Sequence, residues 1–260
     1  MPGIVKAFGL WVAISGPWVA GLAFSQESLQ IPLVERPPTL EDFSGMTPSE
    51  EIRGMMARID GFIQREPDDG EPSAQRTEAY VAYDRLSFYV VFLAFDDEPH
   101  NVRANLSPRE NIWDDDKIGI TIDTFNDQRT AYMFRANPLG VQQDARWREG
   151  GRMDTSYESV WYSEGRLTDQ GFMVRFAIPF RSLRFSESDE QVWGIQVERE
   201  IVRLSENSFW PAYSRSVEGR LNQVATLVGI DDVSPGRNIQ LAPFAFVRDF
   251  EVLDSKAKDG

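Results

Sequence analysis

The sequence predicts an all-β fold, an antiparallel β-sandwich. Several short segments alternate apolar with polar or small residues, and this two-residue period is typical of strands that bury one face. Residues that favour turns separate these segments, and a single segment has the spacing of an amphipathic helix. No repeat with a period of about 20 to 50 residues is evident, so the pattern favours a sandwich over a repeat array.

The composition is that of a globular protein and excludes several classes of function. The chain has 260 residues, 42% of them hydrophobic and 26% charged, which is enough for one large domain with appendages. Its formal net charge of −14 argues against a nucleic-acid partner, because binding a phosphate backbone requires a surplus of lysine and arginine. The absence of cysteine excludes disulfides and thiol chemistry. The single histidine, His100, excludes a multi-histidine zinc site, and its acidic, loop-like setting favours an ordinary surface residue over a catalytic triad.

Residues 1–25 have the pattern of a secretory signal peptide. Lys6 is the only charged residue before an apolar run over 7–24, and the small residues Ala23 and Ser25 favour cleavage before Gln26. The alternative is an uncleaved anchor, for which the run is of marginal length. We expect the mature protein to be exported.

Residues 26–75 are predicted to form a leader with one short amphipathic helix over 47–63. Thr47 suits the N-cap, Pro48 the first helical position and Glu50 the capping box. Five apolar residues then recur at helical spacing, namely Ile52, Met55, Met56, Ile59 and Ile63. We expect this face to pack on the main domain.

Strands dominate residues 76–233, which we predict to be the sandwich. Segment 77–83 is the first strand, and 86–95 is apolar on both faces, so it should be a central strand buried on each side. Further strands are predicted over 156–162, 172–178, 193–202 and 223–229. Residues 234–260 follow a proline-glycine boundary and are either an edge strand or the first strand of a barrel domain missing from this chain.

A β-hairpin over 113–144 organises the domain. Ile118, Ile120 and Ile122 share one buried face, and the pair Asn126-Asp127 supplies the turn because both side chains tolerate the left-handed region. The return strand over 129–136 ends at a second turn. Around the hairpin lie side chains suited to gripping a polar ligand: Trp113, Asp114, Asp115, Asp116, Arg135, Asn137, Gln142 and Asp144.

The acidic run Asp114, Asp115 and Asp116 could hold a structural Ca²⁺ through its hard carboxylate oxygens. It lacks the spaced ligands and the glycine of an EF-hand loop. The alternative is a solvated acidic turn that discourages pairing at a sheet edge. No other cofactor is required. No nucleophile elbow, P-loop or metalloprotease motif is present, so no catalytic residues are predicted.

The order of four segments resembles a bacterial envelope family. These are WDDDKIGITIDTFNDQRTAYMFRANPLGVQQDA, WYSEGRLTDQGFMVRFAIPFRSLRF, WGIQVEREI and PGRNIQLAPF, and the similarity runs over about 64–246. Members of the family begin with a sandwich like carbohydrate-binding module family 9, a DOMON-like jelly roll, and continue into a domain of unknown function that resembles an outer-membrane barrel. The resemblance implies a location in the periplasm or at the outer-membrane face.

The resemblance also implies sugar recognition between two tryptophans. Trp113 matches the first of them, and Arg135 with Asn137 resembles the Arg-x-Asn of the return strand. Gly119 stands where the family has an acidic residue. For the second tryptophan the best candidate is Trp210, in a proline-bounded segment, followed by Trp161, whereas the alternation around Trp193 predicts a core residue.

The expected function is therefore non-catalytic. The chain should recognise the ends of xylan-like or cello-oligosaccharide-like glycans by aromatic stacking and polar contacts, in polysaccharide catabolism at the cell envelope. An alternative is a periplasmic assembly domain of an outer-membrane protein, with a protein partner and no sugar ligand. A third is a truncated product that folds but has no activity alone.

Overall fold

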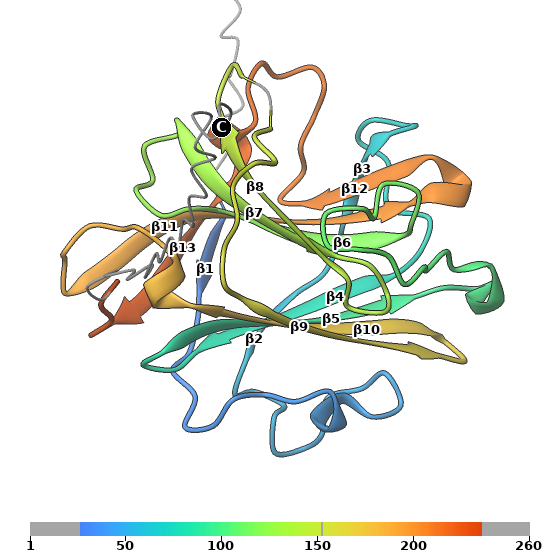
Figure 1. The fold of residues 1–260 in the computed structure, drawn as a ribbon, viewed down its shortest axis with the longest axis horizontal. Coiled ribbons are helices and arrows are strands. Elements are labelled where there is room, and N and C mark those ends of the chain that lie inside the picture. The colour runs from blue at the N-terminus through green and yellow to red at the C-terminus, as the bar shows by residue number, and fades with distance from the viewer. Residues whose placement is uncertain (1–26, 152, 236–260) are drawn as a thin grey trace, which may run out of the picture.

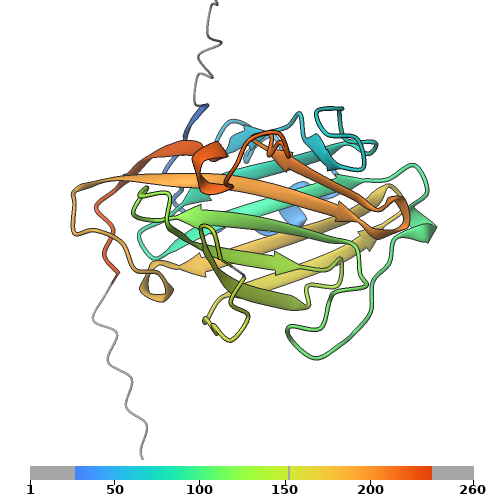
Figure 2. The same cartoon turned by 90° about the horizontal axis from the view of Figure 1, so that it is seen from above.

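The computed structural model describes residues 27–151 and 153–235, which form two β-sheets packed face to face (Figures 1 and 2). The predicted all-β sandwich is confirmed. The predicted signal peptide and the predicted strand of the C-terminal segment lie outside the described residues. Within the described residues, no helix is long and apolar enough to cross a membrane.

The smaller sheet has five strands, each antiparallel to its neighbours. In spatial order they are β2 (Ala57–Ile59), β4 (Thr77–Tyr83), β5 (Ser87–Phe95), β10 (Gly171–Pro179) and β9 (Tyr162–Thr168). The predicted central strand over 86–95 corresponds to β5, which pairs on both sides and buries seven consecutive residues.

The larger sheet has eight strands. Its main path runs through β1 (Ser28–Gln30), β13 (Ala225–Asp231), β11 (Glu190–Ile201), β6 (Lys117–Asp123), β7 (Thr130–Ala136) and β8 (Gln142–Arg148). The other two strands are β12 (Glu206–Trp210), which pairs with β11, and β3 (Ile63–Glu66), which pairs with β12. Only β1 and β13 run parallel among the described strands. Short 3-10 helices are η1 (Glu41–Phe43), η2 (Pro99–Asn101), η3 (Phe180–Ser182), η4 (Val202–Leu204) and η5 (Leu221–Gln223).

The core between the sheets is rich in aromatic residues. Trp161 packs edge-on against Phe176 with ring centroids 4.9 Å apart, and Trp193 packs against Phe185 at 5.4 Å. The isoleucines of β6 point into this core, which confirms the predicted hairpin and its buried face. Trp193 is fully buried, as predicted.

The predicted helix over 47–63 is wrong. The chain makes turns at 50–55, and β2 and β3 occupy the second half of the segment. Ile52, Met56 and Ile59 are buried as expected of a core-facing set, but Met55 is 51% exposed. The helical spacing was accidental, because pairing with β4 and β12 satisfies the backbone from residue 57 onward.

Residues 40–56, the N-terminal segment, add a third layer to the two sheets. Leu40, Phe43, Met46, Ile52 and Met56 form an apolar cluster with the outward side chains of β4, β5 and β10. In Figure 1 this segment, in blue, lies below the smaller sheet. The segment 26–75, predicted as a leader outside the sandwich, also contributes β1, β2 and β3 to the two sheets.

The predicted strand over 156–162 is also wrong, because the strand begins only at Tyr162. Before it the chain crosses from one sheet toward the other and is held by Asp144 of β8. The backbone N–H of Ser159 donates to Asp144 Oδ2 at 2.6 Å, and the indole of Trp161 donates to Asp144 Oδ1 at 3.3 Å. These hydrogen bonds to Asp144, rather than pairing with a neighbouring strand, hold the crossing segment in position.

Candidate binding surface

A polar row crosses the outer face of the larger sheet. Arg135 of β7, Gly119 of β6 and Glu198 of β11 are direct partners in the strand register. Arg135 Nε donates to Glu198 Oε1 across the glycine. The row therefore places a guanidinium and a carboxylate side by side at the centre of the sheet.

Gly119 makes room for this ion pair. A Cβ at position 119 would lie 2.8 Å from Arg135 Cγ and 2.9 Å from Glu198 Oε1, closer than real carbon contacts. The carboxylate beside Arg135 therefore comes from β11 and not from position 119 of β6.

Arg220 inserts into the same face from the segment that follows β12. Its Nη2 lies 2.9 Å from Glu198 Oε2 and 2.9 Å from Thr121 Oγ1, and its Nε donates to Gln196 Oε1 at 2.8 Å. Arg220 is buried, and its guanidinium lies over the rings of three aromatic residues at 5.4 to 5.5 Å: Trp147, Phe209 and Tyr213.

The charges of this cluster fix its protonation. Burial alone would raise the pKa of Glu198, but the neighbouring charges of Arg135 and Arg220, with their hydrogen bonds, outweigh burial and lower that pKa to about 2. Burial also lowers the pKa of Arg135, yet attraction to Glu198 raises it overall. At neutral pH the cluster therefore holds two cations and one anion.

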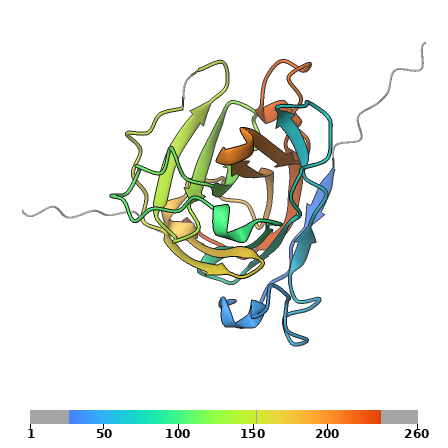
Figure 3. The same cartoon turned by 90° about the vertical axis from the view of Figure 1, so that its right-hand side faces the viewer.

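Two loops rise above this face of the sheet, one after β8 and one after β12 (Figure 3). Glu149 joins them, because its carboxylate accepts the backbone N–H groups of Arg220 and Leu221, each at 3.0 Å. The indole N–H of Trp147 donates to the same carboxylate at 3.2 Å. The aromatic surroundings of Arg220 are thereby held in place.

Trp113 lies in the loop before β6, and its side chain is 51% exposed. Lys117 Nζ donates to the carbonyl of Trp113 at 3.2 Å and pairs with Glu200 Oε1 at 2.9 Å. Lys117 and Gly119 are two residues apart on β6 and so share a face. The main chain of Trp113 is therefore anchored next to the sheet face that carries the row.

Three of the predicted ligand-binding residues serve the fold. Asn137 is fully buried and uses its whole amide: Nδ2 donates to the carbonyl of Asn105 and to Asp115, and Oδ1 accepts from Leu139 and Val141, all at 2.8 to 3.0 Å. Asp144 is fully buried against Arg109, Ser159 and Trp161. Gln142 is half-buried, and its Nε2 donates to the carbonyl of Trp161 at 3.0 Å.

Neither candidate for a second tryptophan reaches this face. Trp161 is 3% exposed and lies in the core. Trp210 is opposite Val197 in the register, so it faces inward and packs against the core cluster. The aromatic residues that do face the row from β12 and its loop are Phe209 and Tyr213.

The acidic run does not suit a calcium ion. The two carboxylate oxygens of Asp115 accept from Asn105 and Asn137, and those of Asp116 accept from the backbone of Arg103 and Val202. Asp114 alone is exposed. Within 27–151 and 153–235, no group of three or more His, Cys, Asp or Glu is placed to hold a metal ion.

The sequence indicated only part of this surface. The alternation of Gln196, Glu198 and Glu200 with apolar residues along β11 is visible in the sequence and marks them as one face. Nothing local indicates that Glu198 meets Arg135, 63 residues earlier, or that Arg220 enters from a loop.

Comparison with known proteins identifies the fold. No family model and no curated protein matches the sequence. Among solved structures, a candidate carbohydrate-binding protein from Bacteroides uniformis is similar with a TM-score of 0.58 and 14% identity, over 78% of this chain and 99% of that one. A family 9 carbohydrate-binding module from Caldicellulosiruptor kristjanssonii, solved with cellotriose, has a TM-score of 0.54 and 10% identity, over 84% of this chain and 100% of that one. The same kind of module solved with glucose has a TM-score of 0.53 and 11% identity, with the same coverage.

Proposed function

We propose that this chain is a non-catalytic carbohydrate-binding module that recognises the ends of xylan-like or cello-oligosaccharide-like glycans. The observation that carries the proposal is the row Arg135, Gly119 and Glu198 on the outer face of the larger sheet, in which the Arg135 side chain keeps 15% exposure, together with the exposed indole of Trp113 in the loop before β6. The shared fold with family 9 modules, one of them solved with cellotriose, supports it.

The row has the donors that sugar hydroxyls require. Arg135 uses Nε for Glu198, while among the described residues its Nη1 meets only the sulfur of Met153 at 3.9 Å, and its side chain is 15% exposed. The guanidinium therefore keeps planar N–H donors for a ligand, fixed in direction by the ion pair. Trp113 offers a flat apolar surface for the C–H face of a sugar ring.

The same proposal includes the location of the protein and its biological role. A module of this kind is exported, acts in the periplasm or at the outer-membrane face, and serves polysaccharide catabolism by holding glycan ends rather than cleaving them. The residues that follow would connect it to an outer-membrane barrel domain. Catalysis is assigned to partner enzymes.

Calorimetric titration of the protein with xylobiose, cellobiose and glucose tests the proposal. We expect binding that falls at least tenfold in Trp113→Ala and in Arg135→Gln, because one loses the stacking surface and the other the fixed donors. Tyr162→Ala is the matched control, since Tyr162 is 54% exposed but lies on β9 of the other sheet. Trp113→Ala and Tyr162→Ala should keep the unfolding temperature of the wild type within a few degrees, whereas Arg135→Gln, which removes one of the two partners of Glu198, should lower it and still give a cooperative transition.

The outcomes separate the two functions considered for this chain. Equal loss of binding in Tyr162→Ala would move the site away from the polar row. No heat with any of the three sugars would reject sugar recognition, and a periplasmic assembly domain with a protein partner would then be the better proposal.

A further inference from the structure

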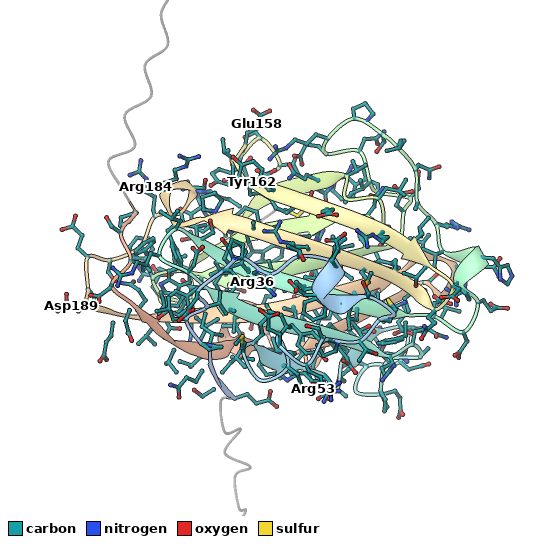
Figure 4. All side chains as sticks on the ribbon, turned by 90° about the horizontal axis from the view of Figure 1, so that it is seen from below. Arg36, Arg53, Glu158, Tyr162, Arg184 and Asp189 are labelled. Carbon is teal, nitrogen blue, oxygen red and sulfur yellow. The ribbon has the colours of Figure 1, made fainter. Side chains whose placement is uncertain are left out.

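A second site lies at the turn end of the β6–β7 hairpin. A cavity of about 390 Å³ opens there between the turn after β6, the end of β8 and the loop after η3. Three arginines line it, Arg146, Arg148 and Arg184, which come from two different segments. Figure 4 shows Arg184 at the margin of the sandwich.

The three arginines are not neutralised by ion pairs. Within the described residues, none of them has a carboxylate oxygen within 4 Å, whereas Arg135 and Arg220 share Glu198. One carboxylate, Asp154, also lines the cavity, and its Oδ1 accepts the backbone N–H and the hydroxyl of Ser156 at 3.0 and 2.6 Å. The lining thus carries three cations and one anion in a protein whose net charge is −14.

Contacts within the protein hold the guanidinium of Arg146 and the main chain of Arg184 in position. The guanidinium of Arg146 lies 5.3 Å from the ring centroid of Tyr132 and 5.0 Å from that of Tyr157. The main chain of Arg184 is fixed at both ends, because its N–H donates to Tyr132 Oη at 3.1 Å and its carbonyl accepts the hydroxyl of Thr124. Less entropy is lost when a ligand binds groups that are already ordered.

Tyr132 adds a further donor. Its hydroxyl oxygen accepts from Arg146 Nη2 at 3.4 Å and from the backbone N–H of Arg184 at 3.1 Å. Tyr132 lines the cavity, and its hydroxyl group has a proton of its own to donate. An anionic ligand in the cavity would accept it.

We propose that this cavity binds a carboxylate-bearing sugar, a uronic acid unit. Arginines recognise a carboxylate through paired N–H donors, and a cavity of this volume is within the range of pockets that hold small ligands. Phe125, which is half-exposed and lines the cavity, supplies the apolar surface on which a sugar ring rests. The site goes beyond the proposed function, because it rests on other residues than the polar row and selects a charged sugar.

Titration of the protein with glucuronate and galacturonate at low salt tests the site. Binding is measured by the heat released or absorbed and by the change in tryptophan fluorescence. Glucose and galactose are the neutral counterparts, and acetate and inorganic phosphate are the anions without a sugar ring. We expect a uronate to bind at least tenfold more tightly than all four, and its affinity to fall as salt is added, because screening weakens exposed charge pairs.

Variants assign the site. Arg146→Gln with Arg184→Gln should reduce uronate affinity at least tenfold, while Arg53→Gln, which removes one positive charge on the other side of the molecule in Figure 4, should leave it unchanged. If the double variant fails to fold, Arg148→Gln replaces it, since that exposed side chain makes no hydrogen bond among the described residues.

Each outcome decides between the two sites. Uronate binding that survives Trp113→Ala but not the arginine variants supports the cavity even if neutral sugars fail to bind. Uronate binding lost in Trp113→Ala and retained in the arginine variants overturns the cavity proposal. Phosphate or acetate binding as tight as the uronates would overturn the sugar part of it.

Discussion

Two guanidinium groups share one carboxylate at the centre of the larger sheet. Arg135 and Arg220 both pair with Glu198, and Arg220 also donates hydrogen bonds to Thr121 and Gln196. Because the anion is fully engaged, the spare donors of Arg135 are the groups left for a ligand. Glu198 is therefore a positioning residue for the surface, and its removal should affect stability as well as binding.

We expect Glu198→Gln to lower the free energy of unfolding by about 3 kcal/mol at pH 7, because it leaves two buried cations without their partner. The pKa of Glu198 is lowered from its ordinary 4.5 to about 2. Its stabilising effect is thus fully present above about pH 4.5 and is lost as pH falls through about 2. The difference between wild type and variant should shrink over this range in urea unfolding.

Glu187→Gln is the control, since Glu187 is exposed in the loop before β11. It should change stability by less than about 0.5 kcal/mol at every pH. A gap between wild type and Glu198→Gln that stays constant from pH 7 to pH 2 would contradict the assignment of the pKa shift to this cluster.

Local sequence pattern predicted the side of the sheet on which a residue lies but not its partners. The inward direction of the isoleucines of β6 follows from a two-residue period. The burial of Asn137 does not, because its bonds to Asn105 and Asp115 depend on how the loop before β6 folds back. The same polar side chain can bind a ligand or close a turn, and only the three-dimensional contacts distinguish the two.

At the scale of elements, the turn between β7 and β8 presses against β9 of the opposite sheet. A Cβ at Gly165 would lie 2.4 Å from the backbone nitrogen of Gly140 and 2.4 Å from the carbonyl oxygen of Pro138. Ser163 Oγ donates to the carbonyl of Gly140 at 2.6 Å. The edge strand and the turn thus touch backbone to backbone.

Gly165→Ala should lower the free energy of unfolding by at least about 2 kcal/mol, because neither backbone can move away without breaking its own hydrogen bonds. Chemical unfolding followed by tryptophan fluorescence measures the loss. Glu164→Ala, on the exposed side of the same strand, should cost less than about 1 kcal/mol. Equal stability of the two variants would show that β9 and the turn are not in close contact.

The elements that the sequence predicted best are the strands whose buried apolar residues follow a regular pattern along the chain. Strands β4, β5 and β10 were recognisable from their apolar residues alone. The helix over 47–63 was wrong because its apolar residues reach the smaller sheet from turns, and β12 was missed because it is short and mixed in polarity. In both cases contacts far away in the chain decide the backbone.

At the scale of the whole molecule, the chain is a sandwich with a further apolar layer on one side. The N-terminal segment covers the outer face of the smaller sheet, where Tyr80, Tyr89 and Val91 are buried beneath it. A face this apolar would otherwise meet water, so the segment and the sheet should stabilise each other. We therefore expect the layers to unfold together.

Phe43→Ala tests this coupling. The ring is fully buried and its centroid lies 5.1 Å from that of Tyr80, so its truncation should lower the free energy of unfolding by about 3 kcal/mol. Scanning calorimetry should show one transition in both proteins, at a lower temperature in the variant. Met55→Ala, which removes a half-exposed side chain from the same segment, should leave the transition within about 2 °C of the wild type. If the segment were independent of the sandwich, Phe43→Ala would instead produce a separate early transition and leave the main one unmoved.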